Sequence, residues 1–155
     1  MYAKDIMTTS VVSVTLDDSV KTCAKLLMEH QFSGLPVIDE KGQLVGIVTE
    51  SDLIKRASNV RSPAVLELLG GLIYLDNPNK YIDELKRAMA EKVKDLMSTK
   101  VVTINEDDTI EQAATTLLAK KFKRLPVVDS EGKVVGIISR RDILSYLYPA
   151  SIEQE

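Results

Sequence analysis

The chain has 155 residues, of which 45% are hydrophobic and 28% charged, and its formal net charge is −3. This length and apolar content predict one compact domain that buries most of its apolar surface. The near balance of charges argues against the broad basic face of a nucleic-acid-binding protein. The sequence shows no charged-then-apolar leader and no apolar run long enough to cross a bilayer, so we expect a cytoplasmic location and no membrane partner.

Cysteine and histidine usage limits the chemistry further. Cys23 is the only cysteine and His30 the only histidine, so one chain cannot build an internal disulfide or a Cys- or His-rich metal cluster. Cys23 is expected to be a small buried residue on the apolar face of a helix, and His30 a partly exposed residue at that helix's end. Because the sequence also offers no nucleophile–base pair and no P-loop, we expect no catalytic residues, no metal and no enzyme activity.

The first predicted elements are a short strand and an amphipathic helix. Val11, Val12 and Val14 predict the strand, after a loop that contains Met7. Asp17, Asp18 and Ser19 then supply the oxygen acceptors that begin a helix. The apolar residues that follow recur at helical spacing and predict one buried stripe: Val20, Cys23, Ala24, Leu27 and Met28.

A hairpin and a second helix follow. Residues 35–38 predict a strand with Pro36 near its start, where a missing N–H is tolerated. Residues 39–42 predict a turn with Gly42 at a positive φ, leading into a strand over residues 44–48. Thr49 and Asp52 then open a second helix. The predicted order is strand, helix, strand, strand, helix.

The whole pattern occurs twice. Residues 4–57 align without gaps on residues 94–147, and more than a third of the aligned pairs are identical. The match includes the closing turn, where Ser139 aligns with Thr49 and Asp142 aligns with Asp52. Such a duplication predicts two like α/β units. We therefore divide the chain into repeat 1 (1–57), an insert (58–92), repeat 2 (93–148) and a loose acidic tail (149–155).

The insert has no counterpart in the repeats. Ser62-Pro63 predicts a helix start, Gly70-Gly71 a break, and Asn77-Pro78-Asn79 a turn before a charged helix over about residues 80–92. Its first half is too apolar for a free linker. We expect this helical insert to cover either the domain's own core or a neighbouring subunit.

The duplicated motifs carry a family resemblance. Each copy contains Leu-Pro-Val-[Ile/Val]-Asp, then Val-Gly-Ile-[Val/Ile], then [Thr/Ser]-x-x-Asp. Finding all three in order, twice, resembles a pair of CBS domains, or Bateman module. The resemblance implies two pseudo-symmetric β-α-β-β-α repeats packed sheet to sheet, with two clefts that take adenosyl compounds such as AMP, ADP, ATP or S-adenosylmethionine. Such pairs are usually regulatory, so the effector would be a ligand and not an obligatory cofactor.

The resemblance also implies that each cleft is built crosswise from both repeats. The Asp would accept from ribose hydroxyls, and Lys or Arg before the Leu-Pro would reach phosphate. The first-choice nucleotide cleft would contain Thr49, Ser51, Asp52, Val101, Lys123, Arg124, Leu125, Pro126 and Arg141. The second cleft, suited to a less charged ligand or none, would contain Val11, Ser33, Gly34, Leu35, Pro36, Ser139 and Asp142.

Simpler interpretations compete with these assignments. A hydroxyl-x-x-carboxylate turn is also a helix capping box, so we expect capping as a second role of Asp52 and Asp142. The cations around Lys123 could form only a solvated helix end. A ligand-independent dimerisation or interaction module, and a sensor of S-adenosylmethionine, remain alternatives to the adenine-nucleotide sensor. The resemblance further implies a homodimer and an unidentified regulated protein, while nucleic acid is not expected as a partner.

Overall fold

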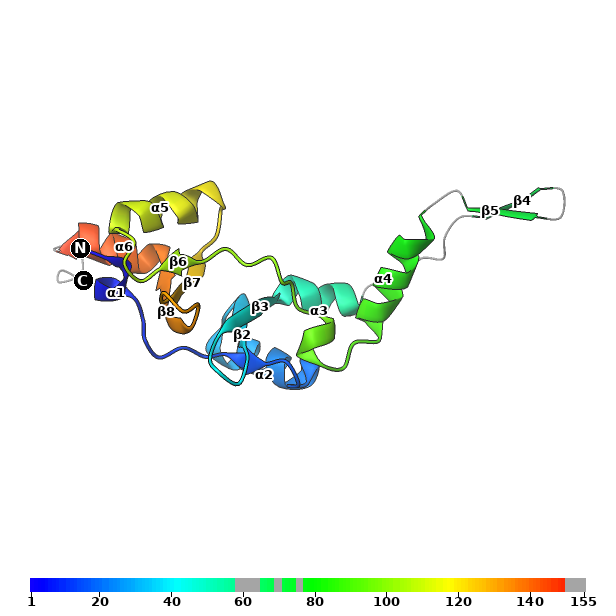
Figure 1. The fold of residues 1–155 in the computed structure, drawn as a ribbon, viewed down its shortest axis with the longest axis horizontal. Helices are drawn as coiled ribbons and strands as arrows, with labels where there is room; N and C mark the ends of the chain where they lie inside the picture. The colour runs from blue at the N-terminus through cyan, green and yellow to red at the C-terminus, as the bar shows by residue number, and fades with distance from the viewer. Residues whose placement is uncertain (58–64, 69–70, 75–76, 150–155) are drawn as a thin grey trace. The chain divides into compact units, whose positions relative to one another are not determined.

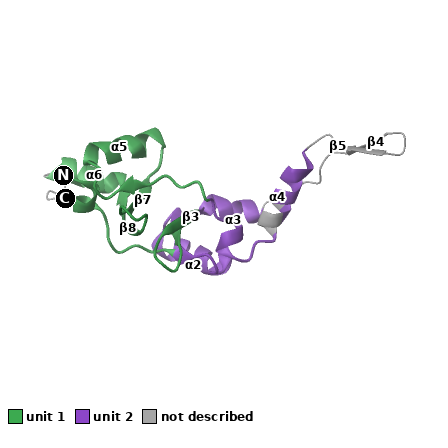
Figure 2. Ribbon diagram, in the orientation of Figure 1, with its two compact units in different colours: residues 1–13, 36–47, 99–155 green, residues 14–35, 48–98 purple. Residues whose placement is uncertain are grey.

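The computed structural model describes residues 1–57, 65–68, 71–74 and 77–149 (Figure 1). By their contacts these residues form two compact units, unit 1 (1–13, 36–47 and 99–155) and unit 2 (14–35 and 48–98) (Figure 2). Each unit therefore combines residues of both repeats. In chain order the elements are α1 (Ala3–Ile6), β1 (Val14–Thr15), α2 (Val20–His30), β2 (Gly34–Ile38), β3 (Leu44–Thr49), α3 (Glu50–Ala57), β4 (Val65–Leu68), β5 (Gly71–Tyr74), α4 (Pro78–Ala88), the 3-10 helix η1 (Val93–Asp95), β6 (Ile104–Asn105), α5 (Ile110–Ala119), β7 (Arg124–Val128), β8 (Val134–Ser139) and α6 (Arg140–Leu147).

The predicted order of elements is confirmed in both copies. Repeat 1 runs β1-α2-β2-β3-α3 and repeat 2 runs β6-α5-β7-β8-α6, and each contributes one three-stranded sheet with its strands in chain order. In the second sheet β6 pairs with β7 in parallel, and β7 pairs with β8 in antiparallel register. The fold is thus the expected mixed α/β architecture with two repeats.

Side-chain caps explain where the long helices begin. The Ser19 hydroxyl accepts from the N–H of Thr22 at 3.0 Å, at the start of α2. In the second copy Thr109 and Gln112 form a full capping box at the start of α5. These bonds satisfy amide groups that have no partner within the helix.

Both hairpin turns contain the predicted glycine. Gly42 has φ +79° and Gly132 has φ +81°, a region that other residues enter only with strain. The Asp39 carboxylate accepts from the N–H groups of Lys41 and Gln43, each at 2.9 Å, which closes the first turn.

The core of unit 1 includes a residue from the very start of the chain. Ala3 of α1 has no exposed surface and packs among the apolar residues of repeat 2. The other buried members of this cluster are Ile104, Ile110, Ala113, Leu117, Leu125, Val127, Ile138 and Ile143. Burial of this apolar surface is the main force that holds the unit together.

The leading segment of each repeat binds the helix start of the other repeat. In unit 1, Ala3 donates its N–H to the Asp108 carbonyl at 2.8 Å, and Lys4 pairs with Asp107 at 2.7 Å. In unit 2, the equivalent Val93 donates to the Asp18 carbonyl at 2.9 Å. There Lys94 pairs with Asp17 at 3.2 Å. This exchange of leading segments was not predicted.

Two sequence predictions for the first repeat need correction. The first strand begins only at Val14, because the preceding segment pairs elsewhere: Thr8 and Ile137 exchange N–H···O bonds of 2.9 Å each. The apolar stripe of α2 is buried at Val20, Cys23 and Leu27, but Met28 is 73% exposed. Within the described chain the Met28 side chain is therefore not part of the core.

Among the described residues of the insert, only those from Pro78 onward include a helix. The predicted charged helix is present as α4, although it begins at Pro78 and ends at Ala88. Where the sequence predicted a first helix, β4 and β5 form an antiparallel hairpin that pairs Val65 with Tyr74. Branched and aromatic residues favour strands, which accounts for the difference. The predicted helix start at residues 62–63, Gly70 and the tail 150–155 lie outside the described residues.

Candidate functional site

The two hydroxyl-x-x-carboxylate turns have the same geometry. Asp52 Oδ2 accepts from the Thr49 backbone N–H at 2.9 Å and from its hydroxyl at 3.0 Å. Asp142 Oδ2 accepts from the Ser139 N–H and hydroxyl, both at 2.7 Å. Each hydroxyl in turn accepts from the backbone N–H of the Asp. The predicted capping role is therefore confirmed for both carboxylates.

Capping leaves half of each carboxylate available. In each turn both bonds to the carboxylate end on Oδ2, and among the described residues no hydrogen bond reaches Oδ1 of Asp52 or Asp142. The two side chains are half-buried. An ionised carboxylate has room for about four donors, so each Asp can hold its helix and also accept from ligand hydroxyls.

Each turn lies beside the strand entry of its own repeat. In unit 2 the Ser33 carbonyl accepts from the N–H of Glu50 at 2.9 Å, which joins the entry of β2 to the start of α3. In unit 1 the Lys123 carbonyl accepts from the N–H of Arg140 at 3.0 Å, and Arg124 pairs with Ser139 in the β7–β8 register.

Among the predicted site residues, unit 1 therefore brings Lys123, Arg124 and Arg141 close to Ser139 and Asp142. Unit 2 likewise brings Ser33 and Gly34 close to Thr49, Ser51 and Asp52. For residues that fall in different units, the crosswise assignment stays a prediction.

Apolar site residues divide into backbone and side-chain contributors. Leu35 and Leu125 are buried, with 0% and 3% of their surfaces exposed, so a ligand could meet only their backbone. Pro36 and Pro126 are also buried, next to them in the strands. Val11 and Val101 are half-buried and lie outside regular structure, before the first strand of each repeat. Their side chains can offer apolar contact to a base.

The remaining ionisable groups that the structure describes include no candidate metal site. Within residues 1–57, 65–68, 71–74 and 77–149, no group of three His, Cys, Asp or Glu is placed to hold a metal ion. Cys23 is fully buried, as predicted, and burial together with Asp18 and Asp52 raises its pKa to about 11. His30 is exposed at the end of α2, as predicted, and stacks on Phe32 with ring centroids 5.3 Å apart.

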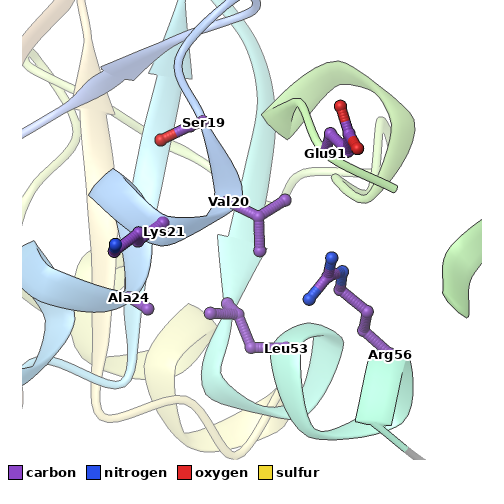
Figure 3. A pocket seen from close by; sticks show the side chains of 7 residues that line it. All are labelled: Ser19, Val20, Lys21, Ala24, Leu53, Arg56 and Glu91. Carbon is purple, nitrogen blue, oxygen red and sulfur yellow. The ribbon is translucent and has the colours of Figure 1, made fainter. Parts of the chain in front are cut away.

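A cavity in unit 2 was not predicted. It has a volume of about 520 Å³, and Figure 3 shows Val20 of α2 and Leu53 and Arg56 of α3 facing the same hollow. The Arg56 Nε donates to the Ala90 carbonyl at 2.7 Å, which fixes the guanidinium at the rim. The lining residues are Ser19, Val20, Lys21, Ala24, Leu53, Arg56 and Glu91. Only the change from Tyr146 in repeat 2 to Arg56 in repeat 1 could have indicated it from sequence.

No helix within the described parts of the chain is both long and apolar enough to span a bilayer.

Comparison with known proteins agrees with the duplicated pattern. The model of the CBS domain matches residues 3–59 and again residues 93–149. The chain is 36% identical over 154 residues to the uncharacterized protein MJ1426 of Methanocaldococcus jannaschii, covering 95% of this chain and 91% of that protein. It is 35% identical over 137 residues to the chloroplastic CBS domain-containing protein CBSX2 of Arabidopsis thaliana. That match covers 85% of this chain but only 55% of the plant protein.

Solved structures show the same architecture. The structure of CBSX2 in complex with AMP superposes with a TM-score of 0.74 at 29% identity, covering 97% of this chain and 98% of that one. The CBS domain pair of MJ0100, in complex with 5′-methylthioadenosine and S-adenosyl-L-methionine, gives a TM-score of 0.66 at 26% identity, with 97% and 98% covered. With both repeats matched in sequence and in fold, the chain belongs to the CBS-domain family and contains a pair of CBS domains.

Proposed function

We propose that this CBS pair is a non-catalytic regulatory module that binds an adenosyl ligand. The observation that carries the proposal is the pair of matched turns, in which Asp52 and Asp142 each cap a helix through Oδ2 and keep Oδ1 for a ligand. Donors at a helix start also favour a bound anion. The related structures hold AMP, or 5′-methylthioadenosine and S-adenosylmethionine, which supports the adenosyl class.

An adenine nucleotide is the preferred ligand because repeat 2 has cationic side chains that can donate to phosphate. Lys123, Arg124 and Arg141 of repeat 2 stand where repeat 1 has Ser33, Gly34 and Ser51. With Thr49, Asp52 and Val101 these cations form the proposed first cleft, which takes AMP, ADP or ATP. The second cleft, around Ser139 and Asp142, takes a less charged adenosyl compound or remains without a ligand.

The test is calorimetric titration with AMP, ADP, ATP and S-adenosylmethionine. The variants Asp52→Ala and Asp142→Ala form a matched pair, because each loses the same two hydrogen bonds to the carboxylate Oδ2. A difference between them therefore reports on the ligand and not on helix capping. Loss of nucleotide binding in Asp52→Ala alone supports the crosswise cleft. Loss in Asp142→Ala alone keeps the function and overturns the site assignment, and no binding by any of the four ligands overturns the function.

The phosphate donors can be tested separately. A charge-assisted hydrogen bond contributes about 1.5 to 3 kcal/mol, so Arg124→Gln should weaken nucleotide binding about tenfold or more. S-adenosylmethionine, which has no phosphate, should bind the variant and the wild type alike. A change in nucleotide affinity within about twofold would argue against a cationic phosphate site.

Exposed apolar helix residues favour self-association as well. Met28 and Ile54 are 73% and 70% exposed in repeat 1, and their counterparts Leu118 and Leu144 are 67% and 56% exposed in repeat 2. Because both repeats present the same apolar pair, we propose that a second copy covers these faces in a two-fold homodimer. Light scattering tests this, and a monomer would contradict it.

A dimerisation module that needs no ligand is the second candidate function, and the same exposed faces favour it. The two candidate functions differ in the expected effect of Asp52→Ala. For a dimerisation module, this substitution should change neither self-association nor the result of the ligand titrations. The regulated protein is expected to recognise a surface that changes with occupancy, by no more than the ligand's differential affinity for the two states. A cytoplasmic location stays a prediction.

A further inference from the structure

One end of unit 1 contains more cationic residues than the proposed phosphate site uses. Between the end of α5 and the start of α6, the Lys123 carbonyl accepts from the N–H of Arg140 at 3.0 Å. The Arg140 Nε donates to the Phe122 carbonyl at 2.8 Å, which joins the two stretches a second time. We call these residues the cationic loop: Lys120, Lys121, Lys123, Arg124, Arg140 and Arg141.

Repeat 1 shows that the fold does not require this charge. Its loop has the same backbone, with Gln31 at φ 55° where repeat 2 has Lys121 at φ 57°. The Ser33 carbonyl accepts from the N–H of Glu50 at 2.9 Å, as Lys123 does from Arg140. The residues at the six equivalent positions include no Lys or Arg: His30, Gln31, Ser33, Gly34, Glu50 and Ser51. The cations of repeat 2 are therefore not needed to form the turn.

Five of the six residues of the cationic loop have no acidic partner within the described parts of the chain. Among the residues that the structure describes, no ion pair joins Lys120, Lys121, Lys123, Arg140 or Arg141 to a carboxylate, and all five are exposed. By contrast, Lys4 and Lys133 in the same unit pair with Asp107 and Glu131. The neighbouring Asp142 uses Oδ2 for the Ser139 cap. Like charges gathered in this way raise the local potential and attract an anion.

The amount of charge indicates which anion. A phosphate monoester carries roughly −1.5 to −2 near neutral pH, and the three positive charges of Lys123, Arg124 and Arg141 already exceed that. Lys120, Lys121 and Arg140 then remain, and the Nη groups of Arg140 have no partner within the described chain. Resting on the proposed function, we propose that these three residues extend the phosphate site to the β- and γ-phosphates. The protein would therefore distinguish ATP from AMP.

The experiment compares ATP, AMP and inorganic tripolyphosphate in magnesium-free buffer at fixed ionic strength. We expect the wild type to bind ATP at least about tenfold more tightly than AMP. The triple variant Lys120→Gln/Lys121→Gln/Arg140→Gln should lose that preference, with AMP affinity changed less than about twofold. Tripolyphosphate should displace ATP from the wild type. The control, Lys41→Gln/Lys133→Gln, removes two lysines at the hairpin turns and should keep the preference.

The outcomes separate this inference from the proposed function. Equal affinities for ATP and AMP, or a triple variant that keeps the preference, would overturn the inference and leave the adenosyl-binding function intact. Failure of every nucleotide to bind would overturn the function itself. A single-stranded oligonucleotide that binds more tightly than ATP, and is lost in the triple variant, would overturn the inference in favour of a nucleic-acid partner.

Discussion

The loops that follow α2 and α5 share their backbone conformation, but the first is uncharged and the second is strongly cationic. Both place a non-glycine residue at a positive φ, Gln31 in one and Lys121 in the other. In both loops a phenylalanine closes the turn onto the preceding helix. The Phe32 N–H donates to the Leu27 carbonyl at 3.0 Å, and the Phe122 N–H donates to the Leu117 carbonyl at 3.1 Å. The fold of a CBS repeat is therefore specified by its turn, cap and apolar positions. The charged positions between them differ between the two repeats, and that difference is where function is expected.

The last helices of the two repeats differ in packing instead. Ile143 of α6 is only 6% exposed, whereas its counterpart Leu53 of α3 is half-buried and lines the cavity of unit 2. Repeat 2 has Tyr146 where repeat 1 has Arg56, whose Nε is bound to the Ala90 carbonyl. Ile143 is thus more deeply packed than Leu53, and repeat 1 has an open hollow with charged residues at its rim.

The largest expected effect tests how strongly repeat 2 depends on the start of the chain. A Cβ at Gly136 would lie 2.7 Å from Met7 Cγ and 3.0 Å from the Thr8 carbonyl oxygen. The Met7 side chain can turn away, but Thr8 is held by its bonds to Ile137. We expect Gly136→Ala to lower the free energy of unfolding by roughly 1 to 3 kcal/mol, measured in urea.

Removing the obstructing side chain provides the control. In the background Met7→Ala the long side chain that would obstruct the new methyl group is gone. Adding Gly136→Ala to Met7→Ala should therefore lower the free energy of unfolding by less than Gly136→Ala does in the wild type. If the two substitutions simply add, the contact between the leading segment and β8 does not limit the packing of unit 1.

The sequence predicts elements that repeat periodically and misses those that do not. The caps at Asp52 and Asp142 and the turns at Gly42 and Gly132 follow from short, specific chemistry, and the structure has them. The leading helix α1 and η1 are too short for any periodicity. The strands β4 and β5 were mistaken for helix because a continuous apolar run does not identify its own conformation.

Burial and site assembly are harder to predict than the elements. An apolar stripe shows that a face avoids water but does not show what covers it, so Met28 was wrongly expected in the core. The Asp–hydroxyl turns could be found from sequence because all their atoms lie within four residues. The cavity beside Arg56 leaves only one trace in the sequence, the Arg in place of Tyr146, because its lining comes from α2, α3 and Glu91, which are distant in sequence.

The pH dependence of stability should distinguish Cys23 from its counterpart Ala113. Burial keeps the folded thiol protonated up to its pKa of about 11, while the unfolded thiol ionises near 9.0. Between these values only the unfolded state releases the proton, so the free energy of unfolding should fall with rising pH, by up to about 1.4 kcal/mol per pH unit. Below pH 9 this thiol contributes no pH dependence.

Cys23→Ala places in repeat 1 the residue that repeat 2 already has at Ala113. Urea unfolding of the variant should show a shallower decline between about pH 9 and pH 11 than the wild type, because the buried thiol is gone. Parallel profiles for the two proteins would contradict the assigned burial effect, since other ionisable groups are common to both.

The two caps should contribute alike, because their geometries match. Thr49→Ala and Ser139→Ala each remove a hydroxyl that accepts from the Asp N–H, at 3.3 and 3.2 Å. Each should lower the free energy of unfolding by about 1 kcal/mol. Equal losses would support the equivalence of the two turns. A loss confined to one variant would show that the repeats differ in helix initiation as well as in charge.

The smallest expected effect is also the sharpest test of the comparison between the loops. Replacing Lys120, Lys121 and Lys123 by the residues of repeat 1, as Lys120→His, Lys121→Gln and Lys123→Ser, removes three positive charges without changing the backbone that those residues adopt. If the turn is specified by Phe122 and the positive φ, the free energy of unfolding should stay within about 0.5 kcal/mol of the wild type. Relief of repulsion among the cations would raise it slightly at low salt, and that rise should vanish at high salt. A loss well beyond this range would mean that the lysines hold the loop, and that their charge is structural.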